Sequence, residues 1–519
     1  MSLFDLPEAD PEFVARVQAA TDLLESIITD RKLLVQLSTE QREALLMAAG
    51  RASKPDIQSK IQYNKERRRT RRKERRAVDE AKLERSGIRK KRNEEVFQTP
   101  YRTAPKELLA YHPDGVPEEE IHVEERRCYV CKTPFTVLHH FYDQMCGECG
   151  DFNFEKRHQT ADLTGRTALV TGSRVKIGYQ AAILMLRAGA KVVVTTRFPR
   201  DAAARYAREA DFGEWKDRLE IFGLDLRHTP SVEVFCDHLV GHLDRLDFII
   251  NNACQTVRRP PAYYEHLMAA EHTALGDLST ECQPLLASYD QLQKAAAGRL
   301  LQPGGATTAE QIVQARGLTN APDLAQIALL PEDVLDNANE LFPQGRLDQD
   351  LQQVDLRDKN SWRLQMHEVS TVELLEVHLV NAVAPFVLDA RLKPLMLKVP
   401  TRDKHIVNVS AMEGQFYRPL KTDKHPHTNM AKASLNMMTR TSAMDYVRDG
   451  IHMNAVDTGW VTDEDPAEIA DRKRVEHRFT PPLDIVDGAA RIVDPILDGI
   501  NTGNHVWGQF LKDYKPTDW

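Results

Sequence analysis

Four cysteines occur as two pairs whose spacing is typical of a metal site. Two residues separate Cys128 from Cys131, and the pair Cys146 and Cys149 follows after 14 intervening residues. Each pair can form a tight turn that directs two thiolates at one ion, and two such turns complete a closed tetrahedral zinc site. The spacing therefore predicts structural zinc in a small ribbon, with a thiol redox pair or buried reduced cysteines as the alternative. The two histidines between the pairs are expected to pack and not to bind the metal.

A second group of residues has the composition of a phosphate-binding turn. The segment Thr171-Gly172-Ser173-Arg174-Val175-Lys176-Ile177-Gly178 links an apolar run, Thr167–Thr171, to a helical pattern, Gly178–Ala188. Backbone N–H groups and the helix dipole at such a turn face a pyrophosphate. Asp225-Leu226 and Asn251-Asn252-Ala253 follow later apolar runs. The order of these segments predicts a dinucleotide site.

The end of the next apolar run bears on which nucleotide is bound. This run ends in Val194-Thr195-Thr196-Arg197, and no acidic residue occurs from Val192 to Arg200. An acid here would bind the ribose 2′-hydroxyl of NAD, whereas the planar fork of Arg197 suits the 2′-phosphate of NADP. The sequence therefore predicts NADP(H). The alternative is that Arg197 pairs with a neighbouring acid.

The elements that must position these residues alternate between strand and helix patterns from about residue 161 to the end. This alternation predicts an α/β fold, a doubly wound parallel sheet with helices on both faces. A segment at about 256–365 interrupts the alternation and is interpreted as a helical insertion. It begins just after the fourth strand, where open sheets bind ligands, and is therefore expected to cover the ligand edge. The predicted strands are Thr167–Thr171, Lys191–Thr196, Leu219–Leu224, Leu246–Ile250, His405–Val409 and His452–Val456.

These segments resemble the short-chain dehydrogenase/reductase (SDR) family over about 163–256 and 366–519. The family's motifs are TGxxxGxG after the first strand, NNAG after the fourth, YxxxK on a later helix and PG after the sixth strand. The resemblance implies a Rossmann-type fold and NAD(P)-dependent oxidoreduction. This chain departs from it at Lys176, which replaces a glycine of the turn, at Cys254 in NNAG, and at Thr458-Gly459 in place of PG.

The resemblance also implies a catalytic tetrad of Asn, Ser, Tyr and Lys, which this chain keeps only in part. Asn381 and Lys432 match the Asn and Lys positions. Thr428 occupies the Tyr position, and an aliphatic hydroxyl is far too weak an acid to replace a phenol. Ala411 occupies the Ser position, and the adjacent Ser410 is expected to point to the other side. The tetrad is therefore degenerate.

A literal YxxxK motif lies elsewhere, at Tyr417 to Lys421. It starts six residues after Ala411, contains Pro419, and is not expected to be the tetrad. Tyr417 or His427 could still supply a rearranged acid–base group. The catalytic candidates are therefore Asn381, Ser410, Tyr417, Thr428 and Lys432. The residues expected to bind the cofactor are Gly172, Arg174, Lys176, Ile177, Gly178, Arg197, Asp225, Leu226, Asn252, Ala253 and Lys432.

Three regions follow from this pattern: a helical region with a basic helix at 1–100, the zinc-ribbon-like module at 101–160, and the SDR-like domain at 161–519. Ser38 and Gln41 have the spacing of a capping box that opens a helix. Between Lys60 and Arg92 there are 16 Lys and Arg against 5 Asp and Glu, a net charge of +11. Because the whole chain carries −8, the rest carries −8 − 11 = −19.

The basic run at 60–92 allows two interpretations. It could contact phosphates of nucleic acid or an acidic protein partner, or it could be a solvated helix that packs on the acidic remainder. We find no secretory signal and no apolar stretch long enough to span a bilayer, so we expect a cytoplasmic protein without a membrane partner, or a nuclear one in a nucleated cell. The seven cysteines are then expected to be reduced.

Three functions remain open on the sequence. The first is an NADP(H)-dependent oxidoreductase of the SDR type with altered proton-transfer residues and an unidentified small-molecule substrate. The second is an inactive NADP(H)-binding sensor or scaffold. The third is a protein that binds nucleic acid or an acidic partner through the basic helix and the zinc ribbon. A homo-oligomer is compatible with each of them.

Overall fold

The computed structural model describes residues 10–100, 122–300, 319–334, 337–418, 421–477 and 480–519. The chain divides into two compact units, Met1–Arg85 and Ser86–Trp519. The second unit joins the end of the basic run, the cysteine module and the SDR-like region in one body. Residues 101–121 of the predicted module lie outside the described residues.

The first unit is helical. Ser38 accepts a hydrogen bond from the backbone of Gln41, and the Gln41 side chain accepts one from the backbone of Ser38, so the predicted capping box is present. Asp10 and Asp56 cap two other helices in the same way, with side-chain oxygens that accept backbone N–H groups. The elements of this unit are α1 (Pro11–Thr29), the 3₁₀ helix η1 (Arg31–Gln36), α2 (Thr39–Ser53) and α3 (Ile57–Leu83).

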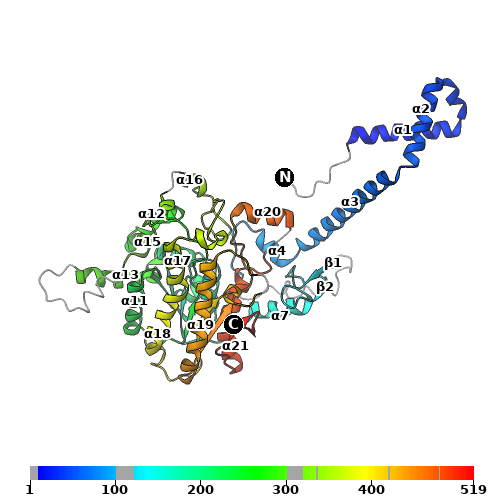
Figure 1. The fold of residues 1–519 in the computed structure, drawn as a ribbon. Coiled ribbons are helices and arrows are strands. Elements are labelled where there is room, and N and C mark those ends of the chain that lie inside the picture. Colours follow the sequence, from blue (N-terminus) through cyan, green and yellow to red (C-terminus); the bar gives the residue numbers. More distant parts are fainter. Residues whose placement is uncertain (1–9, 101–121, 301–318, 335–336, 419–420, 478–479) are drawn as a thin grey trace. The chain divides into compact units, whose positions relative to one another are not determined.

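The second unit is built on an eight-stranded sheet of order β10-β9-β8-β7-β6-β3-β4-β5. Figure 1 shows the helices that surround this sheet. All neighbouring strands are parallel except β10, which pairs antiparallel with β9. The α/β fold is therefore confirmed, and the six predicted strands all exist with ends shifted by at most two residues. The strands are β3 (Thr167–Thr171), β4 (Lys191–Thr196), β5 (Leu219–Gly223), β6 (Phe248–Asn251), β7 (Lys404–Ser410), β8 (Ile451–Asp457), β9 (Phe510–Lys512) and β10 (Lys515–Thr517).

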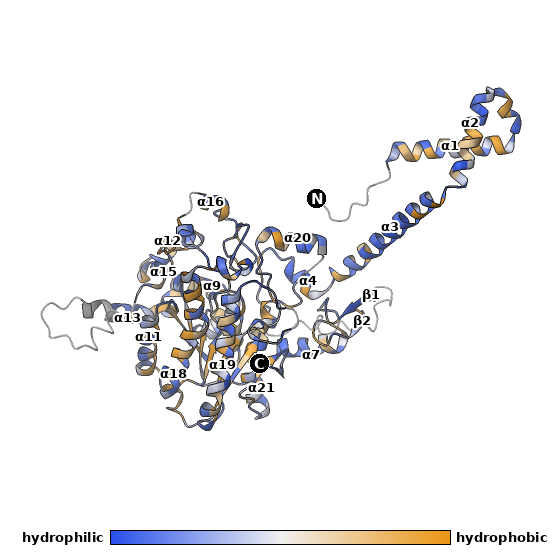
Figure 2. Ribbon diagram, in the orientation of Figure 1, coloured by the Kyte–Doolittle hydropathy of each residue, from blue (hydrophilic) through white to orange (hydrophobic). Residues whose placement is uncertain are grey.

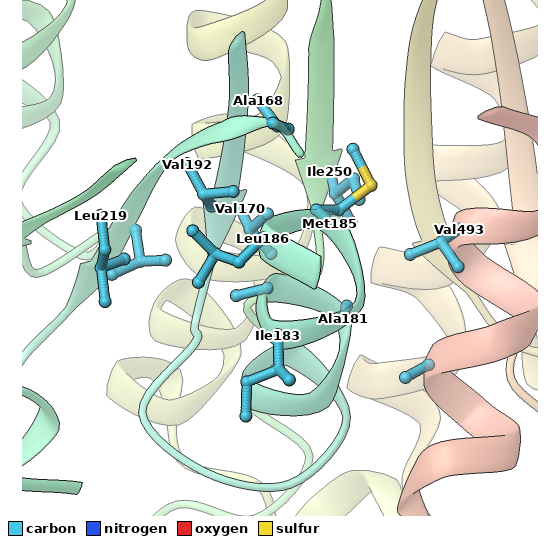
Figure 3. Packing of buried hydrophobic residues seen from close by; sticks show 14 of the residues in the cluster. Ala168, Val170, Ala181, Ile183, Met185, Leu186, Val192, Leu219, Ile250 and Val493 are labelled. Carbon is cyan, nitrogen blue, oxygen red and sulfur yellow. The ribbon is translucent and has the colours of Figure 1, made fainter. Parts of the chain in front are cut away.

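Helices cover both faces of this sheet, so the strands are buried on both sides. One face packs against α8 (Lys176–Arg187), α9 (Pro199–Tyr206) and α21 (Ile485–Thr502). Figure 3 shows Ala181, Ile183, Met185 and Leu186 of α8 packed between strand residues such as Val170 and Val192 and Val493 of α21. The other face packs against α11 (Thr229–His242), α18 (Ala384–Met396) and α19 (Pro426–Arg448). The remaining helices of this part are α10 (Phe212–Trp215), η2 (Lys216–Arg218), η9 (Met412–Gly414) and α20 (Ala467–His477).

One long helix runs through three segments: α17 (Thr371–His378), a π-helical turn η8 (Leu379–Val383) and α18. Its span Thr371–Met396 is the one helix among the described residues that is long and apolar enough to cross a membrane. Val377, Leu388, Leu392 and Leu395 of this helix are fully buried within the protein. Core packing therefore accounts for part of its apolar character, whereas Leu375, Val383 and Phe386 of the same helix are exposed.

The predicted insertion is a chain of short helices and loops between β6 and α17. Its longest helix, α13, packs beside β5, where Tyr289 lies against Gly223. Residues 301–318 and 335–336 lie outside the described residues. The described elements are η3 (Pro261–Tyr264), α12 (Glu265–Glu271), η4 (Leu275–Asp277), α13 (Cys282–Leu300), α15 (Ala321–Leu324), η5 (Pro331–Asp333), α16 (Ala338–Leu341), η6 (Ser361–Arg363) and η7 (Met366–Glu368).

Candidate nucleotide and zinc sites

The turn between β3 and α8 keeps the close backbone approach that a phosphate site needs. Gly172 has φ +67°, and a Cβ on Gly178 would lie 2.2 Å from Nδ2 of Asn252 and 2.4 Å from the carbonyl oxygen of Gly172. The Asn252 amide donates hydrogen bonds to the carbonyl oxygens of Thr171 and Gly172, at 3.0 and 3.2 Å. Both glycines are therefore required by the local geometry.

Lys176 replaces a glycine of the family motif and has a backbone conformation that favours glycine. Its φ is +56°, the left-handed region that glycine enters without cost. A residue with a side chain pays about 1–2 kcal/mol for this conformation. Charges of Glu464, Asp350 and Asp348 raise the pKa of Lys176 against the opposing effect of burial. The turn thus has a left-handed backbone conformation at this position and carries a positive charge there.

A cleft of about 550 Å³ opens above this turn. Lys432 is absent from its lining, because its ammonium group is buried and donates to the carbonyl oxygen of Val409 at 2.7 Å. The predicted cofactor residues that line the cleft are Gly172, Arg174, Lys176, Ile177, Gly178, Arg197, Asp225, Leu226, Asn252 and Ala253.

Arg197 lies in the cleft without a carboxylate partner among the described residues. Its guanidinium donates to the hydroxyl of Tyr264 at 2.6 Å and lies over that ring at 4.6 Å. Two other arginines of the cleft are neutralised: Arg174 pairs with Asp201 at 2.7 Å, and Arg227 pairs with Asp225 at 2.7 Å. The described residues therefore do not support the alternative in which Arg197 pairs with a neighbouring acid.

Asp225 is held as a carboxylate at the same end of the cleft. Burial raises its pKa, but the hydrogen bonds and charge of Arg227, together with the charge of Arg197, lower it overall. The other end of the Arg227 fork reaches Glu376 at 2.9 Å. This chain of charges connects the end of β5 to the long helix α17, and it orders the floor of the cleft.

The insertion forms part of the cleft wall, as expected from its position in the chain. Its residues Tyr263, Tyr264, Gln352 and Asn360 all line the cleft. The insertion is tied to the sheet domain by Arg205, whose guanidinium donates to the carbonyl oxygens of residues 350 and 351, at 2.9 and 2.8 Å. The insertion therefore belongs to the site and is not a separate appendage.

Two arginines of the insertion are used for its own packing. Arg258 pairs with Asp333 at 2.5 Å and with Glu376 at 3.0 Å. Arg259 pairs with Asp355, and its side chain lies over the ring of Tyr263 at 5.1 Å. These guanidinium groups hold the insertion together, which leaves Arg197 as a better candidate for an anionic ligand.

The structure brings the matched tetrad positions to the carboxyl end of the sheet. Asn381 lies in the π-helical turn, where its side chain accepts from the backbone N–H of Gln255 at 2.8 Å and donates to its carbonyl at 3.1 Å. Ser410 is buried and donates to Oδ1 of Asn436 at 2.5 Å, so its hydroxyl is engaged away from any ligand. Thr428 is buried, and its hydroxyl has no hydrogen-bond partner among the described residues.

The two alternative acid–base groups lie in very different places. Tyr417 is 97% exposed on the loop after β7. His427 is 1% exposed, next to Thr428 at the start of α19, and its Nε2 lies 3.3 Å from Oε1 of Glu373. Burial raises the pKa of Glu373, but the neighbouring side chains of His427 and Ser361 lower it overall. Tyr417 is therefore set apart at the surface, and His427 is buried beside Thr428, but neither residue lines the cleft.

The four cysteines meet in one place. Their Sγ atoms all lie within 4.8 Å of one another, and those of Cys131 and Cys146 are 3.7 Å apart. A tetrahedral zinc ion with Zn–S bonds of about 2.3 Å has S···S edges of about 3.8 Å. The first pair lies in the turn that joins β1 (His122–Arg127) to β2 (Pro134–Val137), and the second pair lies at the start of α7 (Gly147–His158). The donor set fits a closed, structural ion.

The histidines between the cysteine pairs do not join this cluster. Nδ1 of His139 accepts the backbone N–H groups of Phe141 and Tyr142, both at 3.1 Å. Its ring packs against Gly150, whose added Cβ would lie 2.5 Å away. Burial lowers the pKa of His139 to about 3, so the ring stays neutral. His139 is therefore a packing residue, as predicted.

The cysteine module is firmly attached to the sheet domain. Arg157 of α7 binds Asp484 and Asp487 at the start of α21, at 2.6 and 2.8 Å, and all three are buried. Phe135, Tyr142 and Phe154 share an apolar cluster with Val461 and Leu483. The module and the sheet domain therefore form one packed body.

One contact links the turn of Cys128 and Cys131 to the edge of the cleft. The backbone N–H of Trp460 donates to the hydroxyl of Tyr129 at 3.0 Å, and Tyr129 lies between the first two cysteines. Trp460 follows Gly459, which has φ +74°. Thr462 of the same loop lines the cleft. The sequence did not reveal this link, because a tyrosine between two cysteines carries no signal for a contact some 330 residues later.

Comparisons with known proteins agree with this geometry. The family model described as short chain dehydrogenase matches residues 166–276, and the one described as enoyl-(acyl carrier protein) reductase matches residues 332–482. An uncharacterised protein, R665 of Acanthamoeba polyphaga mimivirus, is 31% identical over 387 residues, covering 72% of this chain and 71% of that protein. The chain belongs to the SDR family.

Named SDR relatives match over shorter stretches. The short-chain dehydrogenase/reductase pyiH of Pyricularia grisea is 29% identical over 24% of this chain and 54% of its own length. Dehydrogenase/reductase SDR family member 13 of Bos taurus is 35% identical over 19% of this chain and 27% of its own. The chain thus spans about half or less of the length of these named SDR proteins.

Solved SDR structures resemble this one at low sequence identity. A putative NAD(P)-dependent gluconate 5-dehydrogenase from Beutenbergia cavernae with bound NADP is 16% identical, with a TM-score of 0.39 over 68% of this chain and 96% of that one. A short-chain dehydrogenase from Burkholderia cenocepacia in complex with NADP is 15% identical, with a TM-score of 0.40 over 67% and 96%.

Proposed function

We propose that this SDR protein is an NADP(H)-dependent oxidoreductase with a rearranged proton-transfer group. The observation that carries the choice of nucleotide is Arg197, which lies in the cleft beside Tyr264 with no carboxylate partner among the described residues. A guanidinium in this state is suited to a 2′-phosphate, because its donor fork matches phosphate oxygens.

NADPH, when bound, supplies a hydride to a carbonyl carbon. The chain's own residues bind and orient it. The backbone of the turn from Gly172 to Gly178 receives the pyrophosphate at the start of α8, and Lys176 adds positive charge there. Arg197 receives the 2′-phosphate, and the carboxylate of Asp225 lies at the same end of the cleft. The loop of Gln255, held by Asn381, borders the opposite end.

The proton that accompanies the hydride needs a donor, because Thr428 and Ala411 replace the family's Tyr and Ser. His427 is the buried acid–base side chain beside the Tyr position, and its Nε2 lies 3.3 Å from Oε1 of Glu373. We therefore assign the proton to the His427–Glu373 pair. His427→Gln is expected to lower kcat by about 10²–10⁴-fold with little change in nucleotide affinity, since general acid catalysis contributes that much.

Zinc has a structural role in this proposal. The closed set of four thiolates leaves no open position for substrate. One zinc per chain is expected by elemental analysis, and Cys131→Ser is expected to lose it. Because Tyr129 holds the loop at Trp460, metal loss is also expected to weaken nucleotide binding. A purified protein without zinc that binds NADPH normally would contradict this role.

A second function has specific support. Lys432 is engaged with the Val409 carbonyl, Ser410 with Asn436, and the phenol of the tetrad is missing. These contacts favour an NADP(H)-binding sensor that does not turn over.

Calorimetric titration of the zinc-replete protein with NADPH and with NADH separates these proposals from a sheet that serves only as a scaffold. Micromolar or tighter NADPH binding, with weaker NADH binding, supports the cofactor site. No binding of either nucleotide would refute both functions. If NADPH binds, turnover on a panel of carbonyl compounds decides between the enzyme and the sensor.

A further inference from the structure

The basic helix α3 is the strongest charged feature that the oxidoreductase function does not use. From Lys65 to Arg75, eight residues are Lys or Arg and two are Glu, which gives 8 − 2 = +6 in 11 residues. Every residue of this stretch is exposed. Figure 2 shows α3 mostly in the hydrophilic colour, unlike the mixed surfaces of α1 and α2. The helix therefore presents a dense positive surface.

The cations are distributed around the helix and not along one side. At about 100° per residue, the eight side chains cover roughly two thirds of the circumference. The two acids fall on the remaining stripe with Thr70, at positions 66, 70 and 74. The ion pair recorded within this stretch, Arg69 to Glu66 at 3.8 Å, is exposed on both sides and therefore weak.

This distribution indicates what kind of surface α3 fits. A helix that packs on an acidic protein surface needs one basic face, and the remaining cations would only add repulsion. A helix that enters a groove meets phosphates on both flanks. The major groove of B-form DNA is about 12 Å wide and admits an α-helix. Cations on two thirds of the circumference can contact the phosphates on both walls of such a groove.

The side chains of the stretch also limit how the nucleic acid is recognised. Tyr63 is the one aromatic residue of α3, so stacking on the bases of a single strand has little support. The deep, narrow major groove of an RNA duplex does not admit side chains readily. Phosphate contacts carry no sequence information, so the binding is expected to be independent of sequence.

We propose that α3 binds double-stranded DNA through phosphate contacts in the major groove, as a second activity of this chain. Five to six phosphate contacts are a reasonable count for eight cations of which some face away. Such binding releases counterions, so the logarithm of the association constant falls with the logarithm of the salt concentration with a slope of about −0.9 per contact. The expected slope is therefore about −4.5 to −5.4.

The test uses the full-length, zinc-replete protein and a fluorescein-labelled 20-base-pair duplex of arbitrary sequence. Anisotropy gives the dissociation constant between 50 and 200 mM KCl. The triple variant Arg68→Gln, Arg71→Gln and Arg72→Gln removes three neighbouring cations from α3. It is expected to reduce the slope by about 2.7 and to weaken binding at least tenfold at 100 mM salt.

A matched control removes the same charge elsewhere. Arg208, Lys216 and Arg448 are exposed basic residues of the sheet domain. Their triple change to Gln is expected to leave DNA affinity and slope within twofold and 0.5 of the parent. Far-UV circular dichroism and NADPH titration of both variants check that the fold and the cofactor site are intact, so a failure of this proposal is distinguishable from failure of the oxidoreductase.

Four outcomes would overturn the proposal. The first is no binding of the duplex at 50 mM salt. The second is an equal loss of affinity in the two triple variants, which would assign the effect to net charge. The third is competition by polyglutamate as strong as by unlabelled duplex at equal charge, which would identify an acidic protein as the partner class. Stronger binding of single-stranded DNA of the same length would also count against a groove-bound helix.

Discussion

Replacement of Arg197 by Ala tests the nucleotide assignment most sharply. In the structure the guanidinium donates to the hydroxyl of Tyr264 and has no carboxylate to satisfy it among the described residues. Its removal therefore leaves no buried acid unpaired, because Asp225 keeps its ion pair with Arg227. A hydrogen bond to a charged group contributes about 1.5–3 kcal/mol. At about 1.4 kcal/mol per tenfold, NADPH affinity is expected to fall roughly 10- to 150-fold.

NADH lacks the 2′-phosphate, so its affinity is expected to change less than about threefold. Calorimetric titration of both nucleotides against parent and variant measures the two losses in one experiment. Tyr264→Phe is a graded companion, because it removes only the hydroxyl that orients Arg197 and is expected to cost NADPH less than tenfold. Arg208→Ala is the control, since this exposed arginine lies outside the cleft. Equal losses for NADPH and NADH would refute the role of Arg197.

Three further predictions concern the turn, the module and the core. Gly178→Ala is expected to abolish measurable nucleotide binding in a folded protein, because its Cβ would lie 2.2 Å from Nδ2 of Asn252; titration alongside circular dichroism checks this. Arg157→Met is expected to cost about 3–5 kcal/mol in urea unfolding, since it leaves the buried carboxylates of Asp484 and Asp487 unpaired. Arg391→Met at the exposed pair with Glu233 is expected to have little effect on the same measurement. Burial raises the pKa of Asp389 from 3.8 to about 7, so the contribution of Asp389 to stability is greatest below pH 4 and is lost as the pH rises to 7. Asp389→Asn is expected to flatten this decline of the unfolding free energy with pH. An unchanged pH profile in the variant would contradict the prediction.

Much of the fold follows from the sequence for plain physical reasons. The strands are buried on both faces, so they occur as continuous runs such as Val192–Val194, which have no other stable placement. The two glycines of the turn are predictable because only residues without a side chain fit beside Asn252 and Ala253. The cysteine spacing likewise requires a compact cluster. These features depend on residues that are close in the sequence, so they can be predicted from the sequence alone.

The parts that the sequence did not reveal depend on long-range contacts. Arg197 could be assigned only after the insertion was seen to place Tyr264, and not an acid, beside it. The contact of Tyr129 with Trp460 joins two segments whose sequences carry no mark of each other. Lys432 matches a catalytic position by motif, yet its ammonium group is held by the carbonyl of Val409. In each case the partner is chosen by the tertiary packing.

The most direct test of the central claim follows deuterium from NADPH to product. The parent protein is incubated with NADPH labelled at one or the other face of C4, and a panel of carbonyl compounds is screened by mass spectrometry for labelled alcohols. An oxidoreductase is expected to transfer the label from one face only, and His427→Gln is expected to suppress that transfer while NADPH still binds. Tight NADPH binding with no transfer to any compound from the parent protein would contradict the enzyme and favour the sensor.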